Sequence, residues 1–273
     1  MREFLFTDDD FQGLSKRVYK ACGIVLGPHK KEMVYSRIAR RIRANGLTSF
    51  KQYIALVDND SEQEFSHFIN AITTNLTSFF RESHHFEHLS NVLVSEMIKR
   101  NSASKRVRIW SAGCSTGEEP YSIAMTIQGR FPTDWDVKIL ATDLDSSVLA
   151  KAQEGVYSAR SINGLEQEEL RKWFLKSADG ESYKVKPTLQ SLISFKRLNL
   201  LESWPMKGPF DLIFCRNVLI YFDKETKDKL FSGYHRLLTP SGHLFIGHSE
   251  TMGKEHTEFI NLGKTMYQKA SYE

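Results

Sequence analysis

The chain has 273 residues, of which 41% are hydrophobic and 26% charged. This composition is ordinary for a globular protein with room for one large domain or two smaller ones. No run approaches the roughly 18 apolar residues of a membrane span, and the acidic start MREFLFTDDD lacks the apolar core of a signal peptide. We therefore expect a cytoplasmic protein without membrane insertion. The net charge of +4 is too small to indicate nucleic acid by itself.

The three cysteines, Cys22, Cys114 and Cys215, are odd in number and far apart. They form no CxxC pair and have no Cys/His spacing typical of a metal site. This pattern fits a reducing compartment and argues against both a disulfide framework and bound zinc. We expect no metal.

The first 80 or so residues show helical periodicity. Apolar side chains recur at helical spacing at Phe11, Leu14, Val18 and Tyr19, and again at Phe65, Phe68, Ile69 and Ile72. Gly23, Gly27-Pro28 and Asn45-Gly46 interrupt the pattern. The sequence predicts a small all-helical N-terminal domain over residues 1–83 and a linker helix over 84–105.

From about residue 106 short apolar runs alternate with helical patterns. The predicted strands are 107–110, 137–142, 192–195, 210–215 and 243–247, and the predicted helices lie near 119–130, 146–154 and 224–238. Such alternation is typical of an α/β domain with a doubly wound, mostly parallel sheet. We expect this domain over residues 106–273.

A long stretch, about 156–191, separates the second and third predicted strands. It contains a helical piece, Gln167 to Leu175, and then Asp179-Gly180 between two possible strands. The Asp-Gly pair predicts a small β hairpin insertion. Such an insertion usually decorates a domain, and a role in docking a partner is the alternative.

The loop after the first predicted strand reads SAGCSTGEEPYSIA, residues 111–124. In a doubly wound sheet, ligands bind outside the carboxyl ends of the strands. Gly113 and Gly117 allow close approach of the backbone, but G-C-S-T-G is neither GxGxxG nor a P-loop. Glu118 and Glu119 would repel a diphosphate, so the ligand of this loop is expected to lack phosphate.

The second predicted strand ends in ATDLD, with Asp143 at its tip and Asp145 at an expected helix N-cap. An acid at this position is the usual partner of ribose hydroxyls. A glycine loop without a phosphate cradle, together with acids at two strand ends, indicates S-adenosylmethionine. The simpler interpretation is that these acids only complement helix dipoles.

The fourth predicted strand ends in CRNVLIYFD, residues 215–223. Methyltransferases that act on amino groups usually place an Asn/Asp-Pro-Pro-aromatic turn here, and this chain has Arg216 and Asn217 instead. Asn199 follows the third predicted strand, where an adenine or ribose contact would fall. Three functions stay open: a methyltransferase acting on a small molecule or nucleic acid, a module that binds S-adenosylmethionine without catalysis, and a nicotinamide dehydrogenase, which the loop disfavours.

Several motifs together resemble the CheR family of chemotaxis receptor methyltransferases. They are NLTSFFRE (75–82), SAGCSTGEEPYS (111–122), ATDLD (141–145), FCRNVLIYFD (214–223) and GHSE (247–250). The resemblance spans nearly the whole chain in the right order. It implies a Rossmann-like domain that transfers a methyl group from S-adenosylmethionine to glutamate side chains of chemoreceptors, leaving S-adenosylhomocysteine.

The resemblance also implies site residues. Cofactor binding would fall to Asn75, Thr77, Arg81, Gly113, Glu118, Asp143, Asn199, Leu200, Arg216 and Asn217. Glu118 would hold the amino end of the methionine and Asp143 the ribose. Arg81 and Tyr221 would be the catalytic residues beside the transferred methyl. From the residue pattern alone, Arg81 would be predicted to be a solvent-exposed charge without a function.

A helical wheel of residues 29–46 places Val34, Tyr35, Ile38 and Ile42 on one arc. The cations Lys30, Arg37, Arg40 and Arg41 lie on a neighbouring arc. Such a face is most often simply solvated, and RNA or an acidic membrane surface would also fit. Given the resemblance, we expect these four residues to bind the acidic cytoplasmic helical bundle of a receptor, with no nucleic acid, and the enzyme to be a monomer. Some family members also bind a pentapeptide at the receptor tail, and the short turn at SADGESY favours an enzyme that does not need it.

Overall fold

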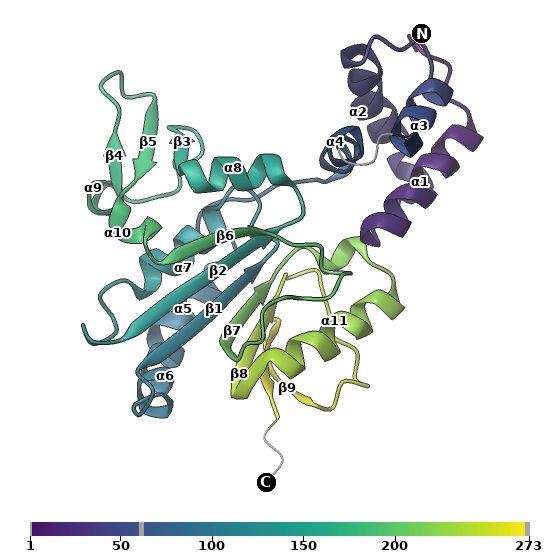
Figure 1. Cartoon of the computed structure of the whole chain (residues 1–273). Coiled ribbons are helices and arrows are strands. Elements are labelled where there is room, and N and C mark those ends of the chain that lie inside the picture. The colour runs from purple at the N-terminus through teal and green to yellow at the C-terminus, as the bar shows by residue number, and fades with distance from the viewer. Residues whose placement is uncertain (1, 60–62, 271–273) are drawn as a thin grey trace.

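The structure is a computed structural model that describes residues 2–59 and 63–270. Its N-terminal part consists of α1 (Asp8–Cys22), α2 (Lys31–Ala44), α3 (Phe50–Asn59) and α4 (Gln63–Ile72), at the upper right of Figure 1. The apolar faces of these helices share one core, which includes Leu14, Ile38 and Phe68. The predicted all-helical N-terminal domain is confirmed.

A seven-stranded sheet forms the second part of the molecule (Figure 1). The strand order is β6 (Ile193–Arg197), β2 (Asp136–Asp143), β1 (Arg106–Ala112), β7 (Phe210–Cys215), β8 (Leu238–Ile246), β10 (Met266–Lys269) and β9 (Phe259–Gly263). The first five strands run parallel, and β10 and β9 are antiparallel to their neighbours. The predicted mostly parallel, doubly wound sheet is confirmed.

Both faces of this sheet are apolar and covered by helices, since successive side chains along a strand point to opposite faces and enter two different cores. In β1, Val107 and Ile109 belong to one core and Trp110 and Ala112 to the other. The first core is closed by α5 (His84–His88), a π-helical turn (Leu89–Leu93), α6 (Val94–Arg100) and α7 (Glu118–Ile127). Helix α11 (Lys224–Leu237) closes the second. The linker helix predicted over 84–105 is thus a run of helical segments that ends at Arg100 and packs on the sheet.

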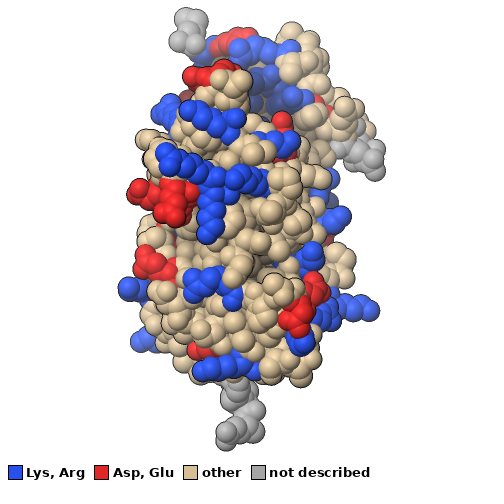
Figure 2. Space-filling model, turned by 90° about the vertical axis from the view of Figure 1, so that its left-hand side faces the viewer, with Lys and Arg blue, Asp and Glu red and all other residues tan. Residues whose placement is uncertain are grey.

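The stretch between α8 (Ser146–Glu154) and β6 forms a separate small sheet. Its strands β3 (Val156–Ser158), β5 (Ser182–Val185) and β4 (Phe174–Lys176) are antiparallel, and α9 (Gln167–Trp173) and α10 (Pro187–Gln190) flank them. The predicted hairpin is confirmed, with Gly180 at φ 78° in its turn. Figure 2 views this side of the molecule and shows Lys and Arg side chains over both its upper and its lower half, with Asp and Glu among them.

Candidate active site

A cavity opens at the carboxyl ends of the parallel strands. Strand β1 lies between β2 and β7, and the chain adds strands on one side of β1 before it crosses to the other. Ligands of doubly wound sheets bind at such a switch point. The lining comes from four strand ends: Gly113 and Ser115; Thr142, Asp143 and Leu144; Leu198, Asn199 and Leu200; and Arg216, Asn217, Val218, Tyr221 and Phe222.

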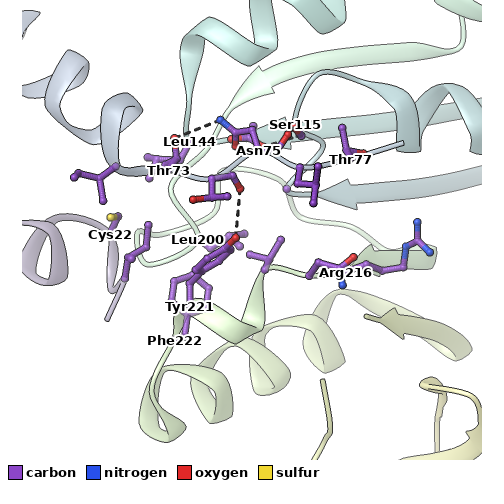
Figure 3. A pocket seen from close by; sticks show the side chains of 18 of the residues that line it. Cys22, Thr73, Asn75, Thr77, Ser115, Leu144, Leu200, Arg216, Tyr221 and Phe222 are labelled. Atoms are coloured by element: carbon purple, nitrogen blue, oxygen red, sulfur yellow. Dashed lines mark hydrogen bonds between the residues drawn. The ribbon is translucent and has the colours of Figure 1, made fainter. Parts of the chain in front are cut away.

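The helical domain and the segment that follows it supply the opposite wall. Its lining residues are Cys22, Ile24, Leu26 and Lys30, followed by the segment Ile72–Leu76 with Thr77 and Arg81. In Figure 3, Asn75, Thr77 and Ser115 lie across the cavity from Tyr221 and Phe222, and Cys22 and Arg216 lie toward opposite ends. The cavity is therefore built from both domains.

Hydrogen bonds fix this wall to the sheet. Thr73 Oγ1 and Asn75 Nδ2 donate to Asp145 Oδ2 at 3.0 and 2.9 Å. The same Asp145 caps α8 through the backbone N–H groups of Ser147 and Val148, as the sequence predicted. Asn75 thus lies at the cavity, but its amide nitrogen is engaged with Asp145.

The linker after α1 is fixed in the same way. Asn199 Nδ2 donates to the carbonyl oxygen of Ala21 at 2.8 Å, and Val25 N donates to the carbonyl oxygen of Tyr221 at 2.8 Å. Asn199 and Tyr221 are both lining residues. The segment that holds Cys22, Ile24 and Leu26 at the cavity is therefore attached to two strand ends of the sheet domain. These three residues were not predicted, because only a contact between distant parts of the chain brings them here.

The loop after β1 offers no phosphate cradle. Gly113 N and Cys114 N donate to the carbonyl oxygen of Thr142 at 2.8 and 2.9 Å, and Ser115 N donates to Asp143 Oδ2 at 2.8 Å. In a phosphate-binding loop these N–H groups would point at the ligand. Because they are used inside the protein here, the loop fits a ligand that lacks phosphate, as S-adenosylmethionine does.

Asp143 lies at the tip of β2 with its carboxylate at the cavity. It accepts hydrogen bonds from Ser115 N and from Asp145 N at 3.0 Å. Burial raises the pKa of Asp143, and the two N–H donors favour its charged form. A carboxylate has about four acceptor positions, so capacity remains for two ribose hydroxyls.

The two acids that begin α7 have different surroundings. Glu118 is buried, accepts from Thr116 Oγ1 at 2.7 Å and is not among the lining residues. Glu119 lines the cavity and accepts from Ser111 Oγ at 2.7 Å and from Arg216 Nε at 2.8 Å. Consecutive helical residues point about 100° apart, which fits the finding that Glu119 lines the cavity while Glu118 is not among its lining residues. The structure brings Glu119 to the cavity, where the resemblance had led us to expect Glu118.

Arg216 is a buried cation with several partners. Besides Glu119, its Nη1 atom donates to the carbonyl oxygen of Arg81 at 2.5 Å and lies 3.1 Å from His85 Nδ1. The guanidinium also lies over the rings of Phe86 and Phe214, at 5.2 and 5.6 Å from their centroids. A buried charge with this many partners holds a fixed position.

The next residue, Asn217, adopts φ 58°, in the left-handed region. Its backbone N donates to Glu250 Oε2 at 2.9 Å, and Ile220 N donates to Oε1 of the same carboxylate at 3.1 Å. Glu250 is the last residue of the GHSE motif and is buried. The motif thus supports the loop that carries Arg216, Asn217 and Tyr221 to the cavity.

Arg81 and Tyr221 both line the cavity. Arg81 Nη1 donates to the carbonyl oxygen of Leu76 at 2.8 Å, and the Tyr221 hydroxyl donates to the carbonyl oxygen of Thr74 at 3.4 Å. Burial raises the pKa of Tyr221, so its hydroxyl keeps its proton at neutral pH. The two expected catalytic residues therefore both line the cavity, and each donates to a backbone carbonyl of the segment 74–76.

The four expected substrate-binding cations are placed differently. Lys30 lines the cavity, and its Nζ atom lies 4.9 Å from the centroid of the Tyr221 ring. Arg37 donates to the carbonyl oxygens of Ala71, Ile72 and Thr73 at the end of α4, at 3.2, 2.9 and 2.7 Å. Arg37 is thus engaged within the helical domain.

The other two cations also differ from each other. Arg41 makes two hydrogen bonds to the buried carboxylate of Glu64, at 2.9 and 2.5 Å. Arg40, by contrast, is exposed. Of the basic arc, Lys30 and Arg40 therefore have side chains most available to a partner.

In residues 2–59 and 63–270, no cluster of three or more His, Cys, Asp or Glu side chains could hold a metal ion. Within the same residues, no helix combines the length and apolar character needed to cross a membrane.

Comparisons with known proteins agree with this architecture. Residues 75–268 match the family model described as CheR methyltransferase, SAM binding domain, and residues 9–73 match CheR methyltransferase, all-alpha domain. A chemotaxis protein methyltransferase of Escherichia coli (strain K12) is 42% identical, over 96% of this chain and 91% of its own. Chemotaxis protein methyltransferase 2 of Pseudomonas aeruginosa is 41% identical over 98% and 96%, and the Borreliella burgdorferi protein 39% over 93% and 92%. The chain therefore belongs to the CheR family of S-adenosylmethionine-dependent methyltransferases, with an all-helical domain followed by the S-adenosylmethionine-binding domain.

Proposed function

We propose that this protein transfers the methyl group of S-adenosylmethionine to glutamate carboxylates in the cytoplasmic region of chemoreceptors. The products are glutamate methyl esters and S-adenosylhomocysteine. The observation that carries the proposal is the meeting of Arg81 and Tyr221 at a cavity whose other end holds Asp143 and Glu119. Acids suit the ribose and ammonium groups of the cofactor, and a cation suits an incoming carboxylate.

The residues needed for this reaction are few. A glutamate side chain is ionised at pH 7, so its oxygen can attack an electrophilic methyl group without a general base. A C–O bond forms as the C–S bond breaks, the electron pair goes to sulfur, and no proton moves. S-adenosylmethionine supplies the methyl group on a sulfonium. Protein residues then contribute mainly by alignment, which can supply roughly 7–11 kcal/mol in favourable cases.

Arg81 is proposed to orient the substrate carboxylate by a charge-assisted hydrogen bond. Too tight a grip would stabilise the ground state and slow the reaction, so the role is one of positioning the carboxylate. Tyr221 can donate from its protonated hydroxyl, because burial raises its pKa. Replacing Arg81 with Ala is expected to reduce turnover at saturating cofactor, and unchanged turnover would remove Arg81 from the reaction.

The receptor would approach along the basic face of α2. Lys30 lies at the cavity and Arg40 is exposed on the same helix, which suits an acidic helical bundle. Arg37 and Arg41 support this face through their contacts with α4. Such a substrate places the enzyme in the cytoplasm, and we expect a monomer that does not require a receptor pentapeptide.

Labelled methyl transfer tests the proposal. The protein is incubated with methyl-labelled S-adenosylmethionine and a chemoreceptor cytoplasmic fragment, and the product is treated with mild alkali. Label released as methanol identifies a carboxyl ester. Label that resists alkali would assign the methyl group to nitrogen or another atom and overturn the glutamate mechanism. Tight cofactor binding without any transfer would favour a module that only senses S-adenosylmethionine.

A further inference from the structure

Arg81 lies between two residues with unusual backbone conformations. Phe80 has φ 50° and Glu82 has φ 58°, in the left-handed region that non-glycine residues seldom adopt. Such outliers persist only when surrounding contacts hold them, and they cluster at functional sites. The contacts on either side of Arg81 therefore show what fixes it.

The N-terminal side is held by α7 and the first core. Phe80 N donates to Ser122 Oγ at 2.9 Å, and the Phe80 ring packs edge-on against Phe86 with 5.3 Å between centroids. These contacts are ordinary packing around one hydrogen bond. They explain how the segment enters the cavity wall.

The C-terminal side is held by the carboxylate of Glu82, whose side chain is only 9% exposed. Glu82 Oε1 lies 2.7 Å from His248 Nδ1 and accepts from His248 N at 3.2 Å and Asn217 Nδ2 at 3.4 Å. Glu82 Oε2 lies 3.6 Å from Arg216 Nη1. One side chain thus joins the Arg81 segment to the loops after β7 and β8.

Arg216 completes the attachment, because the same Nη1 atom donates to the carbonyl oxygen of Arg81 at 2.5 Å. Both the backbone of Arg81 and its neighbour Glu82 are therefore tied to the floor of the cavity. The Arg81 side chain itself has one hydrogen bond, to the Leu76 carbonyl at the rim. Its position depends on how its backbone is held.

We propose that Glu82 is a positioning residue, which acts together with His248 to hold Arg81 beside the reacting methyl group. The inference rests on the role proposed above for Arg81. A different role would be to neutralise buried Arg216, but Arg216 already has Glu119 at 2.8 Å. If Glu82 only balanced the charge of Arg216, replacing Glu82 would change the methyl-transfer rate equally whether or not Arg81 is present. The dependence of the effect on Arg81 can be measured.

The test is a double-mutant cycle with Glu82→Gln and Arg81→Lys. Single-turnover rates of methyl transfer are measured at saturating cofactor and receptor fragment, with cofactor Kd and Tm measured alongside. We expect Glu82→Gln to slow transfer about tenfold or more in the wild-type background, since small misplacements of a positioned group are costly. In the Arg81→Lys background the same change should cost less than about twofold, because coupled residues are not additive. Glu87→Gln, an exposed change in α5, is the matched control and should leave the rate unchanged.

Equal losses in both backgrounds would overturn the proposal, as would a wild-type rate for folded Glu82→Gln. If Glu82→Gln fails to fold, His248→Ala replaces it in the cycle, because the His248 side chain is 65% exposed and its loss spares the core. The same pattern is then expected with a smaller decrease, and an additive effect rejects the role of Glu82. Failure of the proposed function is distinct: the wild-type protein would then yield no alkali-labile methyl ester.

Discussion

Arg216 Nε and Glu119 Oε2 lie 2.8 Å apart, and their side chains are only 2% and 9% exposed. This buried pair fixes the orientation of Glu119 at the cavity, while Ser111 Oγ holds its other oxygen. The neighbouring Glu118 bonds to Thr116 and lies outside the lining. Because a glutamate that lines the cavity should contribute more to binding the amino end of the cofactor than one that does not, cofactor affinity can distinguish the two residues.

We predict that Glu119→Gln weakens S-adenosylmethionine binding much more than Glu118→Gln does. Loss of a hydrogen bond to a charged group costs about 1.5–3 kcal/mol, which corresponds to a Kd increase of roughly 10- to 150-fold. Glu118→Gln should change Kd by less than about threefold, within 1 kcal/mol. Isothermal titration calorimetry measures both. A larger effect at Glu118 would contradict this prediction and support the assignment that the resemblance implies.

Charge-reversal variants on α2 should distinguish residues that bind the receptor from residues that stabilise the helical domain. Arg40 is exposed, so Arg40→Glu is expected to raise the KM for the receptor fragment and leave the cofactor Kd and Tm unchanged. Arg37 donates to three carbonyl oxygens next to Thr74 and Asn75, so Arg37→Glu should also lower Tm and weaken cofactor binding. Identical behaviour of the two variants would contradict this division of the basic face.

Two buried histidines predict acid sensitivity of the fold. Burial lowers the pKa of His85 to about 3 and that of His243 to about 4, whereas an unfolded chain has a histidine pKa of about 6.5. Below that pH the unfolded state binds protons that the native state does not. The free energy of unfolding should therefore fall as pH decreases from 6.5 toward 4, by at most about 1.4 kcal/mol per pH unit for each histidine.

Urea unfolding at pH 7, 6 and 5 measures this slope. His85→Gln, which retains a polar side chain between Arg216 and Lys264, should reduce the slope by about one proton. His67→Gln, the same substitution at an exposed position of α4, is the matched control. A slope unchanged in His85→Gln would show that other groups cause the acid sensitivity.

The parallel strands were predictable because buried strands read as continuous apolar runs. Strand β7 (Phe210–Cys215) is buried at every position and was predicted with its observed bounds. Strand β9 (Phe259–Gly263) buries only Phe259, so it has no apolar run, and neither it nor its partner β10 was predicted. Exposed edge strands form by pairing with a neighbour, which a local pattern does not reveal.

The residues that line the cavity were predictable where they stand at the carboxyl end of a parallel strand, since ligands of doubly wound sheets bind there. Gly113 and Asn199 follow parallel strands, Asp143 is the last residue of one, and all three line the cavity. The orientation of Glu118 and Glu119 could not be predicted, since it depends on the phase with which α7 begins. Arg37 could not be recognised as a structural residue either, because its acceptors at the end of α4 are distant in sequence.

Gly113 allows a sharp test of the loop after β1. It has φ 106°, and a Cβ atom there would lie 2.4 Å from Val218 Cγ2. Gly113→Ala must therefore displace Val218, which adjoins Asn217 on the cavity floor. We expect a lower Tm and a weaker cofactor Kd in this variant.

Gly129→Ala is the matched control, because Gly129 also has positive φ, at 74°, but a Cβ there would meet no atom within 4 Å. Both variants carry the left-handed backbone cost of about 1–2 kcal/mol, which should appear in the free energy of unfolding. Only Gly113→Ala adds the clash at the cavity, so only it should weaken S-adenosylmethionine binding. Equal effects on Kd would mean that the close approach of Gly113 to Val218 does not shape the cofactor site.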